Sequence, residues 1–285
     1  MGRIESDRGR ARRRRSTGIR ARVPALRRQR IVALVLSWYG VHRRRLPWRS
    51  RTDAWTVLVS EILLHQTPVD RVIPVYQEFV ARWPDPVSCA RAPLAEVKRI
   101  TDPLGYHVRG GWLHGIATLV AERPAPHLPA TATELQRLRG VGRYTAGAVA
   151  SIAFGQAEPL VDTNVVRLFS RLFRLPPDHR RALSPQLWAL ADCLVPGDAP
   201  GDFNQGLMEL GALVCRPRVP RCGVCPLEPV CASRQPRLRA IRFEARGGGA
   251  TRARGRTGSR ASGPGVQNGG GRPTTPAPGG PPLEA

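Results

Sequence analysis

The sequence predicts an all-α domain, and three observations lead to that prediction. Between residues 31 and 236, apolar side chains recur at helical spacing in one stretch after another. Prolines and glycines separate these stretches at short intervals. No stretch shows the apolar–polar alternation that is typical of a half-buried strand. We therefore expect helices joined by short connections.

The stretches with helical spacing follow one another along the chain. Asp53 stands just before the second of them, where its carboxylate can accept a hydrogen bond from a free backbone N–H and cap the helix. In order, the expected helices lie within residues 31–39, 55–63, 68–83, 106–122, 142–154, 164–173, 185–194 and 202–214.

The charge of the chain is strongly positive and unevenly spread. The 285 residues carry a formal net charge of +24, of which +17 lies in residues 1–30 and 237–285 together and +7 in residues 31–236. Both end segments are rich in arginine and lack apolar periodicity, so we expect them to be disordered, either as solvated ends or as arms that hold DNA. Such a basic chain indicates a polyanionic partner, most simply nucleic acid.

No apolar run reaches the roughly 18 residues that a membrane span needs. The longest candidate, 31–39, lies between arginine-rich segments and has no small-residue cleavage site behind it. We therefore reject a secretory signal and expect a monomer of the cytoplasm or nucleoid, without a membrane partner.

Four cysteines with the spacing of metal ligands follow the last expected helix. Cys215, Cys222, Cys225 and Cys231 form the pattern C-x6-C-x2-C-x5-C. Nothing marks a secreted protein, so a shared metal centre is favoured over disulfides. Four thiolates can hold either zinc or an iron–sulfur cluster. Zinc sites usually combine two short motifs such as Cys-x2-Cys or His-x3-His. Here only Cys222 and Cys225 form such a motif, which favours a 4Fe-4S cluster.

Residues 135–146 indicate a helix, a tight Gly-Val-Gly turn and a second helix. Gly140 and Gly142 flank Val141 and permit a sharp reversal. The amides that open the second helix can then hold an anion such as a DNA phosphate, and Arg137, Arg139 and Arg143 add positive charge. Taken alone, such a turn is most often only a connection between helices.

Longer motifs give this turn a specific context. The runs LRGVGRYTAGAVASIAFG and VDTNVVRLFSRLF resemble the helix-hairpin-helix and Gly/Pro–Asp signature of the endonuclease III superfamily of DNA glycosylases, and the cysteine spacing resembles its iron–sulfur loop. Upstream, LPWR, SEILLHQTPVDRVIPVY and LGYHVRGGWLH resemble the adenine DNA glycosylases of the MutY type. The resemblance covers about residues 31–233.

The resemblance implies an architecture, a cofactor and a partner. It implies the helix-hairpin-helix glycosylase fold, with a barrel lobe at 53–156 that carries the hairpin and an iron–sulfur lobe made of 31–52 and 157–236. The cofactor is then a 4Fe-4S cluster in a C-terminal loop. The partner is double-stranded DNA with a mismatched or damaged base pair.

Two carboxylates stand where base excision needs them. Cleavage of the bond between base and sugar calls for an acid on the base and a carboxylate near the sugar cation. Glu61 lies inside an apolar stretch, where burial would raise its pKa, and by resemblance it protonates the adenine ring. Asp162 is by resemblance the group that stabilises the cation, although a helix N-cap, for which Thr163 and Asn164 compete, is the alternative.

Tyr144 and Asn164 complete the catalytic set that the resemblance implies. Relatives that also cut the strand carry a lysine at the position of Tyr144, and a tyrosine cannot form the Schiff base. Lys98 is the only lysine of the chain and lies outside every motif. We therefore expect a monofunctional enzyme that leaves an abasic site.

The resemblance also assigns contacts to DNA, although any surface arginine or helix-start tyrosine could look the same. Gln66 and Thr67 would contact the opposite strand, Tyr106 would wedge beside the estranged base, and Arg167 would contact a phosphate. The remaining expected DNA contacts are Arg109, Gly140, Val141, Gly142, Arg143 and Thr145.

Several features leave the substrate open. His65, His107 and Thr163 depart from the family pattern, and the segment after Cys231 offers almost no strand-forming run for the β-rich module that helps MutY-type enzymes to recognise 8-oxoguanine. Adenine excision is favoured. The alternatives are a thymine or uracil glycosylase acting opposite guanine, and a non-catalytic module that binds damaged DNA.

Overall fold

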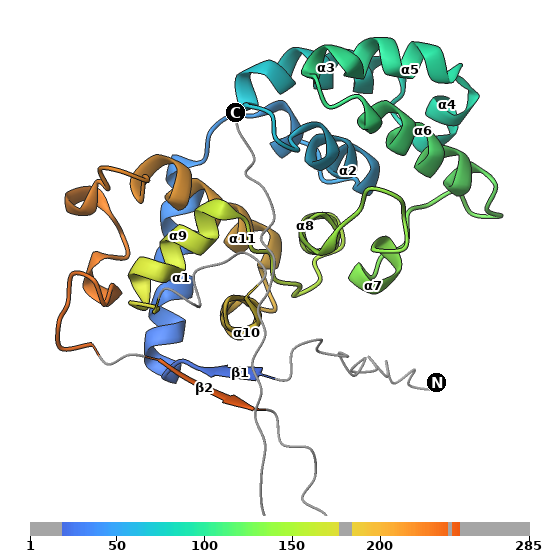
Figure 1. Ribbon diagram of the computed structural model, residues 1–285. Coiled ribbons are helices and arrows are strands. Elements are labelled where there is room, and N and C mark those ends of the chain that lie inside the picture. The colour runs from blue at the N-terminus through green and yellow to red at the C-terminus, as the bar shows by residue number, and fades with distance from the viewer. Residues whose placement is uncertain (1–18, 177–183, 239–240, 246–285) are drawn as a thin grey trace, which may run out of the picture. The chain divides into compact units, whose positions relative to one another are not determined.

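The computed structural model describes residues 19–176, 184–238 and 241–245, and helices dominate it (Figure 1). The all-α prediction is confirmed, with one small two-stranded ladder in addition. The elements are β1 (Ile19–Arg22), α1 (Ala25–His42), η1 (Pro47–Arg49), α2 (Ala54–Leu63), α3 (Val69–Arg82), α4 (Pro86–Arg91), α5 (Leu94–Thr101), η2 (Asp102–Leu104), α6 (Val108–Ala121), α7 (Ala132–Leu135), α8 (Arg143–Ile152), α9 (Thr163–Leu172), α10 (Pro185–Leu194), α11 (Pro200–Glu209), η4 (Leu210–Val214), η5 (Cys222–Val224), η6 (Glu228–Val230) and β2 (Arg242–Ala245).

The helices expected from apolar spacing are present, with ends that shift by a few residues. Asp53 caps α2 as expected, since its carboxylate accepts a hydrogen bond of 2.9 Å from the Thr56 N–H. The first helix of the hairpin was expected from Leu135 onward, but α7 ends there and turns carry the chain on to Gly140. Helices α4 and α5 were not expected. Prolines lie at both of their N-termini, and such prolines predict connections between helices.

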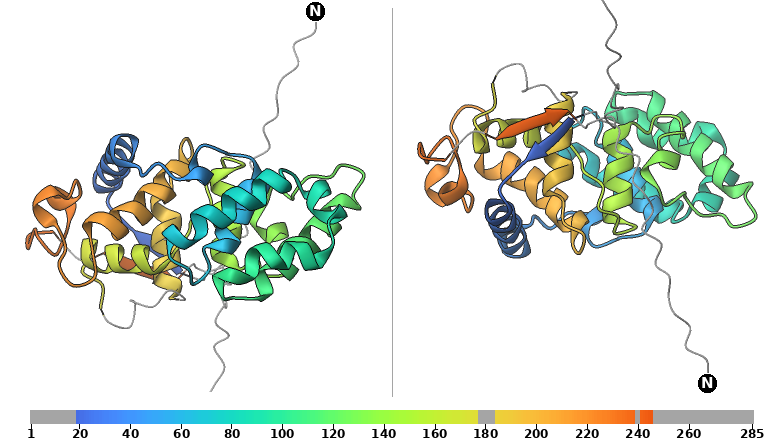
Figure 2. Two further views of the ribbon diagram at one scale, coloured as in Figure 1. Left: turned by 90° about the horizontal axis from the view of Figure 1, so that it is seen from above. Right: turned by 90° about the horizontal axis from the view of Figure 1, so that it is seen from below.

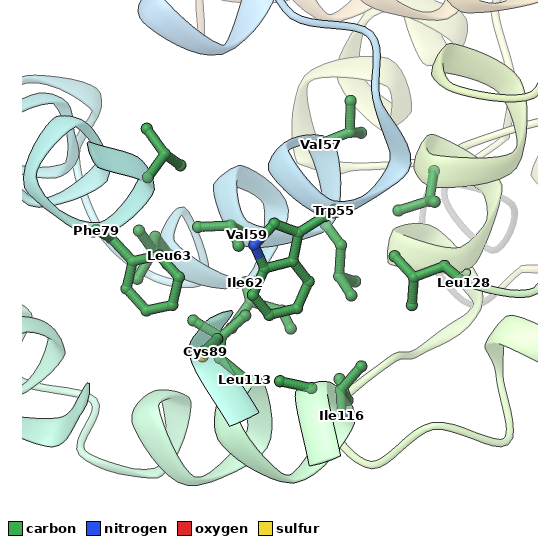
Figure 3. Packing of buried hydrophobic residues seen from close by; sticks show 14 of the residues in the cluster. Trp55, Val57, Val59, Ile62, Leu63, Phe79, Cys89, Leu113, Ile116 and Leu128 are labelled. Atoms are coloured by element: carbon green, nitrogen blue, oxygen red, sulfur yellow. The ribbon is translucent and has the colours of Figure 1, made fainter. Parts of the chain in front are cut away.

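Two hydrophobic clusters form the core. The first joins helices α2 to α8, and Figure 3 shows Trp55 at its centre among Phe79, Leu113 and Ile116. The second joins α1, α9, α10 and α11. In both views of Figure 2 the cyan and green helices α3 to α6 lie together, apart from the yellow and orange helices α9 to α11.

Helix α8 belongs to both clusters, because its neighbouring side chains point in different directions. Ala146, Val149 and Ala150 are buried in the first cluster, whereas Ala148 is buried in the second. The helix that follows the hairpin turn therefore lies between the two cores, and Figure 1 shows it in that position.

The end segments need a correction. Residues 19–30 and 241–245 fall in stretches expected to be disordered, yet β1 pairs antiparallel with β2 and α1 already begins at Ala25. Ala21 is buried against the second cluster, and Arg22 forms a 2.7 Å ion pair with Glu244. The expected disorder of residues 1–18 and 246–285 concerns segments outside the described residues. Within the described ranges, no helix is long and apolar enough to cross a membrane.

Candidate active site

A cavity of about 450 Å³ lies between the two clusters. Its walls come from α2, α8, α11, the start of α9 and the segment between α1 and α2. The four residues expected to be catalytic all line it, together with side chains that were not expected there. The four are Glu61, Tyr144, Asp162 and Asn164.

Glu61 lies on α2 with only 6% of its surface exposed. Burial raises the pKa of its carboxyl to about 7, because a buried charge loses its hydration. A hydrogen bond from Tyr144 lowers this pKa, the nearby Asp162 raises it and Arg49 lowers it again. Near neutral pH, Glu61 can therefore hold a proton and give it up, as a general acid must.

Asp162 caps α9 and also lines the cavity. One carboxylate oxygen accepts a 2.7 Å hydrogen bond from the Val165 N–H and so caps α9, while the residue also lines the cavity. The other oxygen accepts a 2.8 Å bond from the Asn164 amide. Burial raises the pKa of Asp162, and these two hydrogen bonds oppose that rise. The capping geometry thus holds a carboxylate at the wall of the cavity.

A hydrogen-bond chain runs from Asp162 to the cysteine segment. Arg167 donates to the Asn164 side-chain oxygen at 2.7 Å and to the backbone oxygens of Cys215 and Gly211 at 2.8 and 2.7 Å. The Nε and one terminal nitrogen of Arg167 are occupied by these acceptors, and the side chain links α9 to the segment that follows α11. The expected contact of Arg167 with a DNA phosphate stays a prediction.

Tyr144 lines the cavity, and no lysine does so among the described residues, so the cavity has no lysine amine as a nucleophile. The Tyr144 hydroxyl lies 3.1 Å from the Met208 sulfur, and burial raises its pKa well above the ordinary value, with the carboxylates of Glu61 and Asp162 adding to the effect. The tyrosine is therefore neutral at physiological pH. Lys98, on α5, is exposed and does not line the cavity.

Three further charged residues line the cavity and were missed by the sequence reasoning. Glu209, at the end of α11, is fully buried and accepts hydrogen bonds from Arg44, at 2.9 Å, and from Arg49. Burial raises the pKa of Glu209, but its bonds to both arginines outweigh this and hold the pKa below its ordinary value. About 160 residues separate Glu209 from its partners, so no local pattern could have paired them.

The hairpin turn has the geometry that the two glycines suggested. Gly140 has a φ of 83°, and a Cβ there would lie 2.4 Å from the Trp112 ring, so only glycine fits. Gly142 is the exposed N-cap of α8 and leaves the first amides of that helix without a side-chain cap. Val141 is buried in the first cluster. The Arg143 guanidinium lies 3.7 Å from the centre of the Trp188 ring.

The other residues expected at DNA divide into exposed and buried ones. Gln66 is exposed with a φ of 53°, and Tyr106 is 37% exposed at the start of α6. Thr145 and Arg109 are buried, and Arg109 donates to the backbone oxygen of His65 and to the hydroxyl of Thr67. The guanidinium of Arg109 therefore lies beneath the surface in this structure, and its expected phosphate contact stays a prediction.

All four cysteines of the spaced motif line a second cavity, of about 330 Å³. None of them is disulfide-bonded, and the Cys215 sulfur accepts a 3.4 Å hydrogen bond from Arg171. Burial raises the pKa of the Cys225 thiol to about 11, and the three other cysteines add to that rise. Among the described residues, no three side chains from His, Cys, Asp and Glu are placed to hold a single metal ion.

Comparison with known proteins agrees with this arrangement. A family model described as HhH-GPD superfamily base excision DNA repair protein matches residues 59–192. The chain is 47% identical over 211 residues to the adenine DNA glycosylase of Homo sapiens, a match that covers 70% of this chain and 39% of the human protein. It is 35% identical over 217 residues to the thymine-DNA glycosylase of Aeropyrum pernix, covering 74% of this chain and 95% of that protein.

Solved structures agree as well. A thermostable thymine-DNA glycosylase superposes with a TM-score of 0.66 at 31% identity, over 74% of this chain and 98% of that one. An endonuclease III trapped covalently on DNA shares the fold, with a TM-score of 0.62 at 22% identity over 76% of this chain and 100% of that one. The chain spans about two fifths of the length of the mammalian adenine DNA glycosylases that it matches. This chain, whose hairpin is followed by a helix that lines the cavity, belongs to the HhH-GPD superfamily of base excision DNA repair proteins.

Proposed function

We propose that this protein is a monofunctional DNA glycosylase that removes adenine paired with 8-oxoguanine or guanine in double-stranded DNA. One observation carries the proposal: Glu61, with a pKa of about 7, and the carboxylate of Asp162 line the same cavity. Cleavage of a glycosidic bond requires a protonated acid at the base and a negatively charged carboxylate near the sugar, and these two residues supply such a pair. The enzyme would act as a monomer on DNA in the cytoplasm.

The reaction follows from these two groups. The hairpin amides hold a phosphate while the target nucleotide turns out of the duplex into the cavity. Protonated Glu61 donates its proton to a ring nitrogen of adenine, and the bond between base and sugar breaks with its electrons going to the base. Asp162 stabilises the cation left on the sugar and orients the water that adds to it, and the proton that this water loses passes to the Glu61 carboxylate. The products are free adenine and an abasic site.

The choice of adenine over thymine is supported by sequence identity, which is 47% to an adenine DNA glycosylase and 35% to a thymine-DNA glycosylase. The alternative, removal of thymine or uracil opposite guanine, is supported by the match to nearly the whole of a thymine-DNA glycosylase.

The nucleophile of the reaction is water. Tyr144 cannot form a Schiff base, and the only lysine of the chain, Lys98, lies on the surface away from the cavity. Borohydride should therefore trap no covalent adduct between the enzyme and DNA, and an adduct as abundant as that of a lysine-dependent lyase would contradict the assignment.

The four spaced cysteines are proposed to hold a 4Fe-4S cluster. They line one cavity, and burial raises the pKa of the Cys225 and Cys231 thiols, as expected of ligands that a metal centre deprotonates. Four thiolates can also hold zinc, but only Cys222 and Cys225 have the short Cys-x2-Cys spacing that zinc sites usually use twice, which favours the cluster. The cluster would brace the segment that Arg167 links to Asn164.

Single-turnover excision tests the substrate. Duplexes that carry A opposite 8-oxoguanine, A opposite G, T opposite G and U opposite G are compared under one condition. We expect the first two to react fastest, and faster release of thymine or uracil would overturn the choice of adenine. The Glu61→Gln variant separates an enzyme from a binding module, because it should bind the duplex with unchanged affinity but lose excision.

A further inference from the structure

Three segments that are expected to touch DNA meet at helix α6. They are the turn at residues 65–67, the exposed Tyr106 and the hairpin that begins at Gly140. Two side chains of α6, Arg109 and Trp112, lie between them. The proposed function uses neither of the two.

Arg109 holds the first segment. It is fully buried, and one of its nitrogens donates to both the His65 backbone oxygen and the Thr67 hydroxyl. Its guanidinium carbon also lies 5.4 Å from the centre of the Tyr106 ring. Gln66, between the two residues that it holds, has a φ of 53°, a conformation that non-glycine residues rarely adopt without support. Arg109 thus contacts both the 65–67 turn and Tyr106, the residue expected to wedge beside the estranged base.

Trp112, one helical turn further on, holds the second and third segments. Its ring meets those of His65 and Tyr106 edge to face, with centroid separations of 6.2 and 5.6 Å. It also packs so closely on Gly140 that a Cβ there would lie 2.4 Å from the ring. A displacement of this ring would therefore alter the packing of all three segments.

His65 connects the 65–67 turn to α8, the helix that follows the hairpin. Its Nε2 lies 3.1 Å from the hydroxyl of Thr145, in the helix that follows the hairpin. Burial lowers the pKa of His65, and the charge of Arg109 lowers it further, so the ring is neutral at physiological pH. A neutral imidazole can share a hydrogen bond with the threonine hydroxyl and remain packed against tryptophan without the cost of a buried charge.

Burial of the Arg109 charge costs folding free energy, which indicates that this residue has a role other than stabilising the fold. No carboxylate pairs with it within the described residues, and its Nε and one terminal nitrogen have no hydrogen-bond partner there. A buried, incompletely paired charge destabilises a fold, and an apolar side chain of similar size would often do better. Such a residue is consistent with a positioning role, in which geometry matters more than stability.

We propose that Arg109 and Trp112 are positioning residues that hold the 65–67 turn, Tyr106 and the Gly140 turn in one fixed register, and so set the preference for the base opposite the excised one. This inference rests on the proposed glycosylase function. It assigns to the helical core itself the discrimination of the opposite base. A small shift of a positioned group can cost about 10- to 100-fold in rate, so loss of either side chain should be measurable.

The test uses the full chain with Trp112→Leu, Trp112→Phe and Arg109→Lys. The matched control is Trp38→Leu, because Trp38 is also half-buried and also contacts a histidine, His42, at 5.0 Å, but on α1 and outside the cavity. Two quantities are measured for each protein. One is the affinity for duplexes with an uncleavable abasic analogue opposite 8-oxoguanine, guanine or cytosine, and the other is the single-turnover rate on adenine opposite the same bases.

We expect Trp112→Leu and Arg109→Lys to reduce the preference among opposite bases by about 10-fold in both quantities. Trp112→Phe, which keeps an aromatic edge, should recover most of it, and Trp38→Leu should keep the wild-type ratios at a similar melting temperature. Unchanged ratios in both Trp112→Leu and Arg109→Lys would overturn the proposal. A wild-type protein that excises no base would instead overturn the proposed function, while one that shows no preference in binding would overturn this inference alone.

Discussion

Arg167 donates a 2.7 Å hydrogen bond to the side-chain oxygen of Asn164, whose amide in turn donates to Asp162. Arg167 also holds the backbone oxygen of Cys215. Replacement of Arg167 by glutamine should leave Asn164 free to rotate and weaken the orientation of Asp162. We expect the single-turnover rate to fall about 10- to 100-fold with little change in affinity for DNA. A loss confined to affinity would show that Arg167 contacts phosphate after all.

The pKa of Glu61 sets the pH dependence of excision. Glu61 must carry its proton to act, so the single-turnover rate should fall about tenfold per pH unit above a midpoint of about 7. At low pH the rate should fall again as Asp162 takes up a proton. The measurement is a profile of single-turnover rates against pH. A profile that stays flat up to pH 9 would show that Glu61 is not the acid.

The same shift predicts how stability depends on pH. The folded-state pKa of Glu61 is raised, so its stabilising effect is complete below its unfolded-state pKa of about 4.5 and is lost as the pH rises through about 7. The loss is on the order of 3 kcal/mol. Glu61→Gln should therefore gain stability relative to the wild type between pH 5 and pH 8, as measured by denaturant unfolding at both values. An equal difference at the two pH values would contradict this.

Glu209 should influence Glu61 through Arg49. In Glu209→Gln the charge of Arg49 is no longer compensated, so it should lower the pKa of Glu61 and move the pH profile of excision to lower pH. The variant should also lose about 3–5 kcal/mol of stability, because a buried ion pair is broken. Arg44→Met leaves the pair of Arg49 and Glu209 in place and should keep the midpoint. A common midpoint for all three proteins would refute the coupling.

The cysteine cavity predicts a defined metal content. Purified protein should contain about four iron atoms per chain and absorb visible light. Cys225→Ser should lower both, whereas Cys193→Ser, a change at a half-buried cysteine outside the cavity, should alter neither. One equivalent of zinc with no iron would contradict the cluster.

The sequence predicted the long helices and the two carboxylates that line the cavity, because these depend on local patterns. Apolar spacing marked α2 and α9, and family motifs identified Glu61 and Asp162. It did not predict the ladder of β1 and β2, since strands of four residues carry too few alternations to stand out among arginines.

Long-range pairing explains the remaining differences. Glu209 and Arg49 are 160 residues apart and become partners only when α11 packs beside the segment before α2. Arg109 is charged and lies in a motif that the resemblance places at DNA, so the sequence suggested a surface position. Burial of its guanidinium depends on the 65–67 turn, which supplies the acceptors.

The ladder of β1 and β2 has a mechanical consequence. Ile19 pairs with Ala245 and Arg22 with Arg242, so the chain enters and leaves the ladder at the same end. A pulling force applied across Ile19 and Ala245 would load one pair at a time, like a zipper, and would not shear all the pairs together. The ladder should therefore open at low force, long before either hydrophobic cluster yields.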